Sequence, residues 1–247
     1  MTTSPTLLEK NGSVATITLN RPDAANALSA EMRASLASRL AEVNDDDQID
    51  VVVIQAAGRI FCGGVDLSDL PTKPIEWRKR VIAAQENHLA VLRMPKIVIA
   101  AVQGAVVGGG ASLALSADIL VAADDAKFLF PFVKLGIVPD GGSSFFLHAK
   151  LGNAVATDLL LTGGTLSVAE AESRGLTRRV VPAENLHSTA KELAEQISRL
   201  PRHSRMLTKS LCRQNWAANI ETYLSHEADA FGLATAIGET PKSRKTA

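Results

Sequence analysis

Three glycine-containing loops carry the residue types and spacings in this sequence that are best suited to chemistry. They are residues 61–66 (FCGGVD), 104–110 (GAVVGGG) and 136–143 (GIVPDGGS). In proteins that alternate strands and helices, ligands gather where strands end and helices begin. Glycine permits positive φ and close backbone approach, which leaves amide N–H groups free to bind an anion or a polarised carbonyl. The recurrence of such loops therefore favours a ligand site.

The second loop has the clearest electrostatic character. Gly108 to Gly110 runs directly into the apolar stretch Ala111 to Ala117, which predicts a helix. The loop amides would then lie at a helix N-terminus, whose partial positive charge favours an oxyanion. A tight turn without chemistry is the alternative interpretation of a single glycine run. The loop lacks the GK[ST] ending of a phosphate-binding loop and does not match GxGxxG, which disfavours nucleotide chemistry.

The elements that must position these loops alternate between strand and helix. Apolar or alternating runs predict strands over residues 14–19, 51–56, 97–102, 118–123 and 179–181. Helical spacing behind Ser29, a plausible N-cap, predicts a helix that ends at an acidic turn. A polar segment leads into a predicted helix over residues 76–93, which could cover a pocket. This order of elements predicts an α/β fold.

The chain becomes helical after Pro182. Helices are predicted over residues 186–200, 204–216 and 220–236. Because this tail has no strand, we interpret it as an oligomerisation element, and we divide the chain into a binding and catalytic core (1–185) and a helical oligomerisation region (186–247). Three basic residues of the tail, Arg202, Arg205 and Lys209, are interpreted as a solvated helix surface.

Composition excludes several classes of function. Lysine plus arginine and aspartate plus glutamate both number 26, so neither nucleic acid nor an anionic membrane is expected as a partner. Cys62 and Cys212 lie far apart, and the five histidines have no metal-ligand spacing, so no disulfide framework and no metal site is predicted. No apolar run reaches the roughly 20 residues needed to cross a bilayer, and no signal-peptide pattern is present. We expect a cytoplasmic protein.

Five motifs in a fixed order give the chain a resemblance to a known family. They are LNRPDAANALS, GRIFCGGVDL, QGAVVGGGASLALSADI, KFLFPFVKLGIVPDGGSS and LLTGGTLSVAEAESRGLTRRVVP. In this order they resemble the crotonase superfamily of enoyl-CoA hydratases and isomerases. The resemblance implies the ClpP/crotonase fold, a spiral of β-β-α units with a C-terminal helical trimerisation region. It also implies an acyl-CoA thioester substrate, no cofactor beyond the coenzyme A of that substrate, and a homotrimer or hexamer.

The resemblance also assigns roles to loop residues. The amides of Val65 and Gly109 would form the oxyanion hole for the thioester carbonyl, and each such donor is typically worth about 3 kcal/mol in the transition state. For Asp66 the sequence favours a different role over coenzyme A binding, the capping of a following helix. The complete set of positions matched to coenzyme A or substrate binding is Ala25, Ala27, Gly63, Asp66, Leu67, Gly108, Ser112, Phe132 and Pro139.

Two positions depart from the hydratases that the chain resembles. Those enzymes carry one glutamate two residues after the triple glycine and another after the proline of an FxxPE motif. This chain has Ser112 and Phe132 there. Water addition needs a base to deprotonate the water and an acid to protonate the α-carbon. Serine cannot replace a carboxylate and phenylalanine removes the polar group, so efficient hydration is not expected.

Asp140 is the carboxylate that the third loop would bring close to the reacting centre. In some enoyl-CoA isomerases, and in 4-chlorobenzoyl-CoA dehalogenase, an aspartate at the matching position is the acid/base or the nucleophile. The alternative role is an N-cap for a helix that begins near Gly141, and the two roles are compatible. Phe130 and Phe132 would desolvate this aspartate and raise its pKa toward a value useful for proton transfer.

The sequence therefore predicts an enzyme, first of all a Δ3-Δ2-enoyl-CoA isomerase in which Asp140 removes and returns a proton. One alternative is an enoyl-CoA hydratase that uses Asp140 with a water held by Ser112. Another is a non-catalytic acyl-CoA-binding protein on the same scaffold. Dehalogenation by attack of Asp140 on an aryl carbon is disfavoured, because aromatic residues make up only 4% of the chain and no aromatic cluster is evident beside the loop.

Overall fold

The computed structural model describes residues 4–68, 70–214 and 219–237. Its strands are β1 (Thr6–Asn11), β2 (Val14–Leu19), β3 (Val51–Ala56), β4 (Ile97–Val102), β5 (Ala105–Val107), β6 (Ile119–Ala123), β7 (Lys127–Leu129), β8 (Thr165–Ser167) and β9 (Val180–Val181). Its α-helices are α1 (Ala30–Asp45), α2 (Pro74–Arg93), α3 (Gly109–Ser116), α4 (Ser143–Leu151), α5 (Asn153–Thr162), α6 (Val168–Ser173), α7 (Leu186–Ser198), α8 (Arg202–Gln214) and α9 (Ile220–Ile237). Short 3₁₀ helices cover Pro22–Ala24, Val133–Leu135 and Ala183–Asn185. Within the described ranges, no helix combines the length and apolar composition that crossing a membrane requires.

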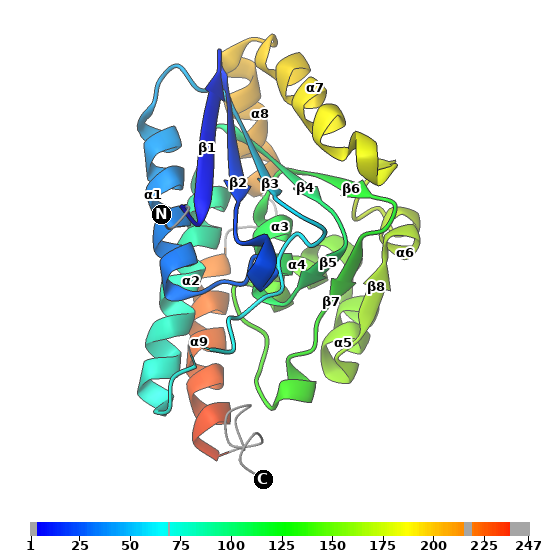
Figure 1. The fold of residues 1–247 in the computed structure, drawn as a ribbon. Coiled ribbons are helices and arrows are strands. Elements are labelled where there is room, and N and C mark those ends of the chain that lie inside the picture. The colour runs from blue at the N-terminus through cyan, green and yellow to red at the C-terminus, as the bar shows by residue number, and fades with distance from the viewer. Residues whose placement is uncertain (1–3, 69, 215–218, 238–247) are drawn as a thin grey trace.

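Two sheets organise the chain (Figure 1). The larger has the strand order β1-β2-β3-β4-β6-β9, in which β1 is antiparallel to β2 and the other neighbours are parallel. The smaller has the order β5-β7-β8, with β5 parallel to β7 and β8 antiparallel to it. Strands β5 and β7 follow β4 and β6 directly in the chain, so the chain passes repeatedly from the large sheet to the small one. The α/β class is confirmed.

Both faces of the central strands β3, β4 and β6 are buried, which explains why these strands are nearly continuous apolar runs. One face carries Val53, Ile99 and Val121 and packs against the apolar side of α7, around Leu186 and Ala190. The other face belongs to the main core, which includes buried residues of α1, α2 and α3. Figure 1 shows α7 on one side of the sheet and α1 and α2 on the opposite side. Helix α7 is therefore an integral layer of the core.

Most long elements match their predicted ranges. The strands predicted over residues 14–19, 51–56 and 97–102 are confirmed, and those predicted from residues 118 and 179 begin one residue later. Ser29 is confirmed as the N-cap of α1, because its hydroxyl accepts a hydrogen bond from the amide of Met32 at 3.1 Å. Strand β1 was not predicted, since Glu9 and Lys10 make it a largely exposed edge strand.

The interpretation of the basic residues on α8 as a solvated surface holds for Arg202, which is exposed, and is wrong for the other two. Arg205 and Lys209 are buried. Arg205 forms an ion pair with Asp50 at 2.9 Å, and Lys209 pairs with Asp118. These two carboxylates stand directly before strands β3 and β6, so the ion pairs fix α8 against the ends of the sheet. Residues 215–218, into which the helix predicted over 204–216 extends, and residues 238–247 lie outside the described residues of the predicted oligomerisation region. The role of this region in assembly stays a prediction.

Candidate active site

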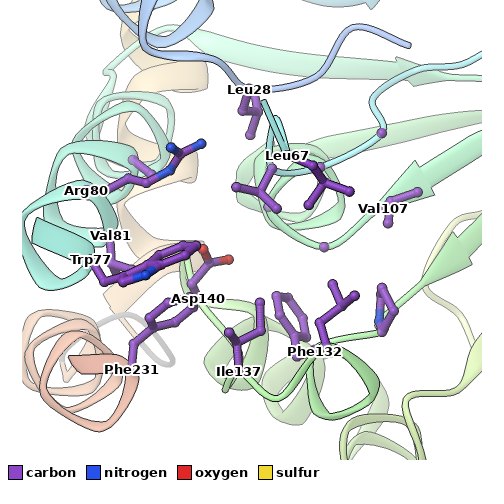
Figure 2. A pocket seen from close by; sticks show the side chains of 18 of the residues that line it. Leu28, Leu67, Trp77, Arg80, Val81, Val107, Phe132, Ile137, Asp140 and Phe231 are labelled. Atoms are coloured by element: carbon purple, nitrogen blue, oxygen red, sulfur yellow. The ribbon is translucent and has the colours of Figure 1, made fainter. Parts of the chain in front are cut away.

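A cavity of about 120 Å³ lies where the three glycine loops meet helices α2 and α9 (Figure 2). The loops contribute Gly63, Gly64, Val65, Val107, Gly108, Gly109, Ile137 and Asp140 to its lining, and the adjacent residues Leu67 and Phe132 also line it. Helix α2 contributes Trp77, Arg80, Val81, Ala84 and His88, and α9 contributes Phe231. The three loops identified from the sequence therefore do converge on one site. The helices close it with side chains that are mostly apolar.

The first loop is held rigidly between two neighbours. The amide of Gly63 donates to the carbonyl of Ala25 at 2.8 Å, and the amide of Val107 donates to the carbonyl of Cys62 at 2.9 Å. Gly64 has a φ of +83°, and a Cβ atom added there would lie 2.9 Å from the Val107 carbonyl oxygen. Only glycine fits this position without strain. The direction of the next amide, that of Val65, is thus set by the backbone around it.

The second loop presents an amide at a helix N-terminus, as predicted. Gly109 is the first residue of α3, and Gly108 before it has a φ of +50°. The first amides of a helix have no partner within it. In the part of the chain that the structure describes, neither the Val65 nor the Gly109 amide has a hydrogen-bond acceptor. Two free donors on one cavity are what an oxyanion hole requires, and that role for them stays a prediction.

Asp140 contributes a shielded carboxylate to the cavity. The residue as a whole is half-buried, but its Oδ1 is inaccessible to solvent and has no hydrogen-bond partner within the described residues. A Cβ atom added at Gly109 would lie 3.7 Å from this oxygen, so the carboxylate is near the predicted oxyanion hole. Burial raises the pKa of Asp140 to about 6, although the positive charges of Arg80 and Arg33 oppose the shift. Such a carboxylate can both accept and return a proton near neutral pH.

The alternative role of Asp140, capping α4, is not the one its side chain performs. The N-cap of α4 is Gly142, and no side chain of the cap bonds to the helix. Glu227 of α9 occupies that end instead, because it accepts hydrogen bonds from the amides of Gly142 at 2.8 Å and Ser144 at 3.3 Å. Burial raises the pKa of Glu227 to about 8, opposed by the Gly142 amide and reinforced by the nearby charge of Asp140. No sequence pattern indicates this contact.

Ser112 and Phe132, which replace the hydratase glutamates, differ in their placement. Phe132 lines the cavity. Ser112 is fully buried behind the cavity wall, where its hydroxyl lies 3.0 Å from the carbonyl oxygen of Asp140 and also contacts the Ser143 hydroxyl. Phe130 is buried but is not part of the lining, so of the two phenylalanines expected beside Asp140 only Phe132 faces the cavity.

The other predicted binding residues are divided between the cavity and its surroundings. Ala25, Ala27, Asp66 and Pro139 do not line it. The expected helix cap at Asp66 is wrong, because the next helix, α2, begins only at Pro74. Asp66 accepts hydrogen bonds from the amide and hydroxyl of Ser68 and pairs with Arg21 at 3.2 Å, and these contacts lower its pKa, the Ser68 hydroxyl most. It stabilises the turn after the first loop.

An aromatic group flanks the cavity, contrary to the expectation from composition. Trp77 and Phe231 pack with ring centroids 5.3 Å apart, and the guanidinium of Arg80 lies 5.9 Å from the centre of the Trp77 ring. Figure 2 shows both rings on the same side of the cavity as Asp140. The sequence did not reveal them, because α2 and α9 are separated by more than a hundred residues and meet only in the fold.

Comparisons with known proteins identify the scaffold. The family profile described as Enoyl-CoA hydratase/isomerase matches residues 9–245. The chain is 36% identical over 239 residues to a probable enoyl-CoA hydratase of Mycobacterium bovis, covering 96% of this chain and 91% of that protein. It is 38% identical over 226 residues to the 1,2-epoxyphenylacetyl-CoA isomerase of Escherichia coli, covering 90% and 86%. The crystal structure of an enoyl-CoA hydratase from Bacillus halodurans matches with a TM-score of 0.90 at 27% identity, covering 99% of this chain and 100% of that one. The predicted crotonase fold is confirmed, and the chain belongs to the enoyl-CoA hydratase/isomerase family.

Proposed function

We propose that this enzyme is an enoyl-CoA isomerase in which Asp140 moves a proton along the acyl chain of the substrate. The observation that carries the proposal is the composition of the cavity wall. Among the described residues that line it, Asp140 is the one carboxylate, and its buried Oδ1 has no partner there. A proton-transfer site needs a base whose pKa lies near the working pH. The raised pKa of about 6 gives Asp140 that property.

The reaction follows from this arrangement. The thioester carbonyl of a 3-enoyl-CoA accepts hydrogen bonds from the Val65 and Gly109 amides, which stabilise the negative charge that develops on its oxygen. Asp140 takes a proton from the α-carbon, and the electrons move into the dienolate. The same carboxyl group then returns the proton to the γ-carbon, giving the conjugated 2-enoyl-CoA. No water enters this sequence, and the aromatic rings of Phe132 and Trp77 would keep water out.

Hydration has less support from the site. The hydratase alternative required Ser112 to hold the attacking water, but the Ser112 hydroxyl lies behind the wall and contacts the Asp140 carbonyl oxygen. Phe132, at the second glutamate position, presents an apolar ring. A purified enzyme should therefore convert a trans-3-enoyl-CoA faster than it hydrates crotonyl-CoA.

Asp140→Asn is the direct test, with conversion followed by the ultraviolet absorbance of the conjugated thioester. We expect turnover to fall by roughly 10²-fold to 10⁴-fold, the contribution typical of a general acid or base, while acyl-CoA binding by calorimetry persists. Asp124→Asn is a matched control, because Asp124 accepts a bond from a backbone amide outside the cavity at 3.2 Å. Full turnover in Asp140→Asn would remove the mechanism. Binding without turnover in the unmodified enzyme, across a broad panel of thioesters, would favour the non-catalytic alternative.

A ring-bearing acyl group is a second candidate substrate. The support is the aromatic wall formed by Trp77, Phe231 and Phe132, since aromatic pairs add about 0.5–1.5 kcal/mol beyond the area they bury. The similarity to a 1,2-epoxyphenylacetyl-CoA isomerase points the same way. Comparing kcat/KM for straight-chain and phenyl-substituted 3-enoyl thioesters distinguishes the two. A Trp77→Leu variant should lose preference for the phenyl substrate if the ring stacks there.

A further inference from the structure

His88 is a buried polar residue of the cavity to which neither the sequence motifs nor the proposed reaction gives a role. It lies on α2, is only 3% exposed, and lines the cavity together with Asp140 and Gly109. Its Nε2 lies 3.1 Å from the carbonyl oxygen of Gly109, the residue whose amide faces the predicted oxyanion hole. A carbonyl oxygen can only accept, so Nε2 carries the proton and Nδ1 carries the lone pair.

The same imidazole ring also contacts the turn that carries Asp140. A Cβ atom added at Gly141 would lie 2.6 Å from His88 Cε1 and 2.7 Å from Nδ1, so the ring packs directly on the Gly141 backbone. The Cβ of Ser112 lies 3.1 Å from the same point. The ring therefore stands beside the small Ser112 side chain, at the position where related hydratases carry a glutamate. A side chain as large as glutamate at residue 112 would compete with the ring for this space.

Burial gives His88 a fixed charge state. It lowers the pKa of the imidazole to about 4, and the hydrogen bond to the Gly109 carbonyl opposes this shift only in part. Nδ1 has no partner among the described residues, and a proton placed there would point at the Gly141 backbone without an acceptor. The ring is thus held neutral, with one N–H directed at the oxyanion helix.

We propose that His88 is a positioning residue that joins the two halves of the reaction site. Its Nε2–H holds the first carbonyl of α3, and with it the backbone that presents the Gly109 amide, while its other edge supports the turn that presents Asp140. The carboxylate and the oxyanion donor act on the same substrate, so their relative placement decides the rate. A displacement of about 1 Å in such a site can cost about 100-fold. The role applies to any thioester reaction at this oxyanion hole, and its kinetic test rests on the proposed isomerase activity.

The test compares His88→Gln with His88→Leu. Glutamine can donate to the Gly109 carbonyl, whereas leucine fills similar space without a donor. We expect His88→Leu to lower kcat for 3-enoyl-CoA isomerisation by roughly 10-fold to 100-fold with a much smaller change in KM, and His88→Gln to retain most of the activity. Thr177→Val is the control for loss of a buried donor, because the Thr177 hydroxyl donates to the Leu120 carbonyl at 2.7 Å, away from the cavity. It should lower stability and leave kcat unchanged.

A spectroscopic measurement keeps the inference testable if a variant fails to fold or if the wild type lacks isomerase activity. Nitrogen-15 NMR of the wild-type enzyme should show His88 neutral with its proton on Nε2 near pH 7, and acyl-CoA binding should shift the Gly109 amide signal. A proton on Nδ1 would overturn the proposal. So would a folded His88→Leu enzyme with unchanged kcat, or equal losses in the leucine and glutamine variants. If the expected NMR signals are seen but the enzyme has no isomerase activity, the result counts against the proposed function and not against the role of His88.

Discussion

The pH dependence of the proposed isomerase reaction tests the protonation state assigned to Asp140. As the base, Asp140 must be ionised in the free enzyme, so kcat/KM should rise with pH through its pKa of about 6 and then level off. At about pH 5 roughly one-tenth of such a group is ionised, and at about pH 7 roughly nine-tenths. The expected loss between these two pH values is therefore about tenfold. An aspartate with its ordinary pKa would lose almost nothing over the same range.

The charges around Asp140 provide a check on the cause of this inflection. Arg80 and Arg33 favour the ionised form, whereas burial disfavours it. Arg80→Met should therefore raise the pKa of Asp140 and move the inflection in kcat/KM to higher pH. Glu227, whose pKa is about 8, is protonated over the pH range in which kcat/KM rises. Glu227→Gln should therefore leave this rise in kcat/KM in place.

The assay is the initial rate of 3-enoyl-CoA conversion at low substrate concentration, measured across the pH range in buffers of constant ionic strength. Thermal unfolding at each pH serves as the control for loss of folded enzyme. An inflection near pH 4 would refute the reasoning, because it would mean that burial does not perturb the carboxylate. A shift to lower pH in Arg80→Met would refute the assignment of the opposing charge.

Three further predictions follow from the same geometry. Burial raises the folded pKa of Asp140 from 3.8 to about 6, so this group weakens the fold progressively as pH rises between those values. Asp140→Asn should then be more stable than wild type at pH 7, by up to about 3 kcal/mol in chemical denaturation, and equal stability would contradict the burial argument. Glu227→Ala should cost about 2–4 kcal/mol, because it leaves the amides of Gly142 and Ser144 at the start of α4 without their acceptor, whereas Glu227→Gln should cost less in the same measurement. Gly64→Ala forces a side chain against the Val107 carbonyl at positive φ and should lower kcat by roughly 100-fold through the displaced Val65 amide; unchanged kcat would argue against that amide as a donor.

The strands of the large sheet were predictable because their physical requirements are local. A strand covered on both faces must be apolar along its whole length, and residues 51–56 and 97–102 meet this condition. The three-residue strands β5, β7 and β8 could not be predicted in this way, since so short a run has no measurable hydrophobic period. They form because the neighbouring loops bring their backbones together, as when the amide of Val107 bonds to Cys62.

Some residues of the candidate site could be predicted from local sequence, whereas others depend on long-range packing. Gly64, Gly108 and Asp140 stand in loops whose glycine pattern reports a backbone requirement at that point in the chain, so the sequence indicates them. No sequence pattern distinguishes Trp77 and Phe231 from other apolar residues of two amphipathic helices. They form part of the site only because α2 and α9 pack together and place them on one wall of the cavity.

The two substitutions at the hydratase glutamate positions become interpretable only when the cavity is considered as a whole. Ser112 is too short to reach the cavity, and the imidazole of His88 packs beside it. Phe132 adds an apolar ring to the wall. Each change alone removes a carboxylate, but together they leave Asp140 as the one acid on the described lining and shield it from water. Shielding is what raises its pKa. The same substitutions that disfavour hydration thus favour proton transfer by the remaining carboxylate.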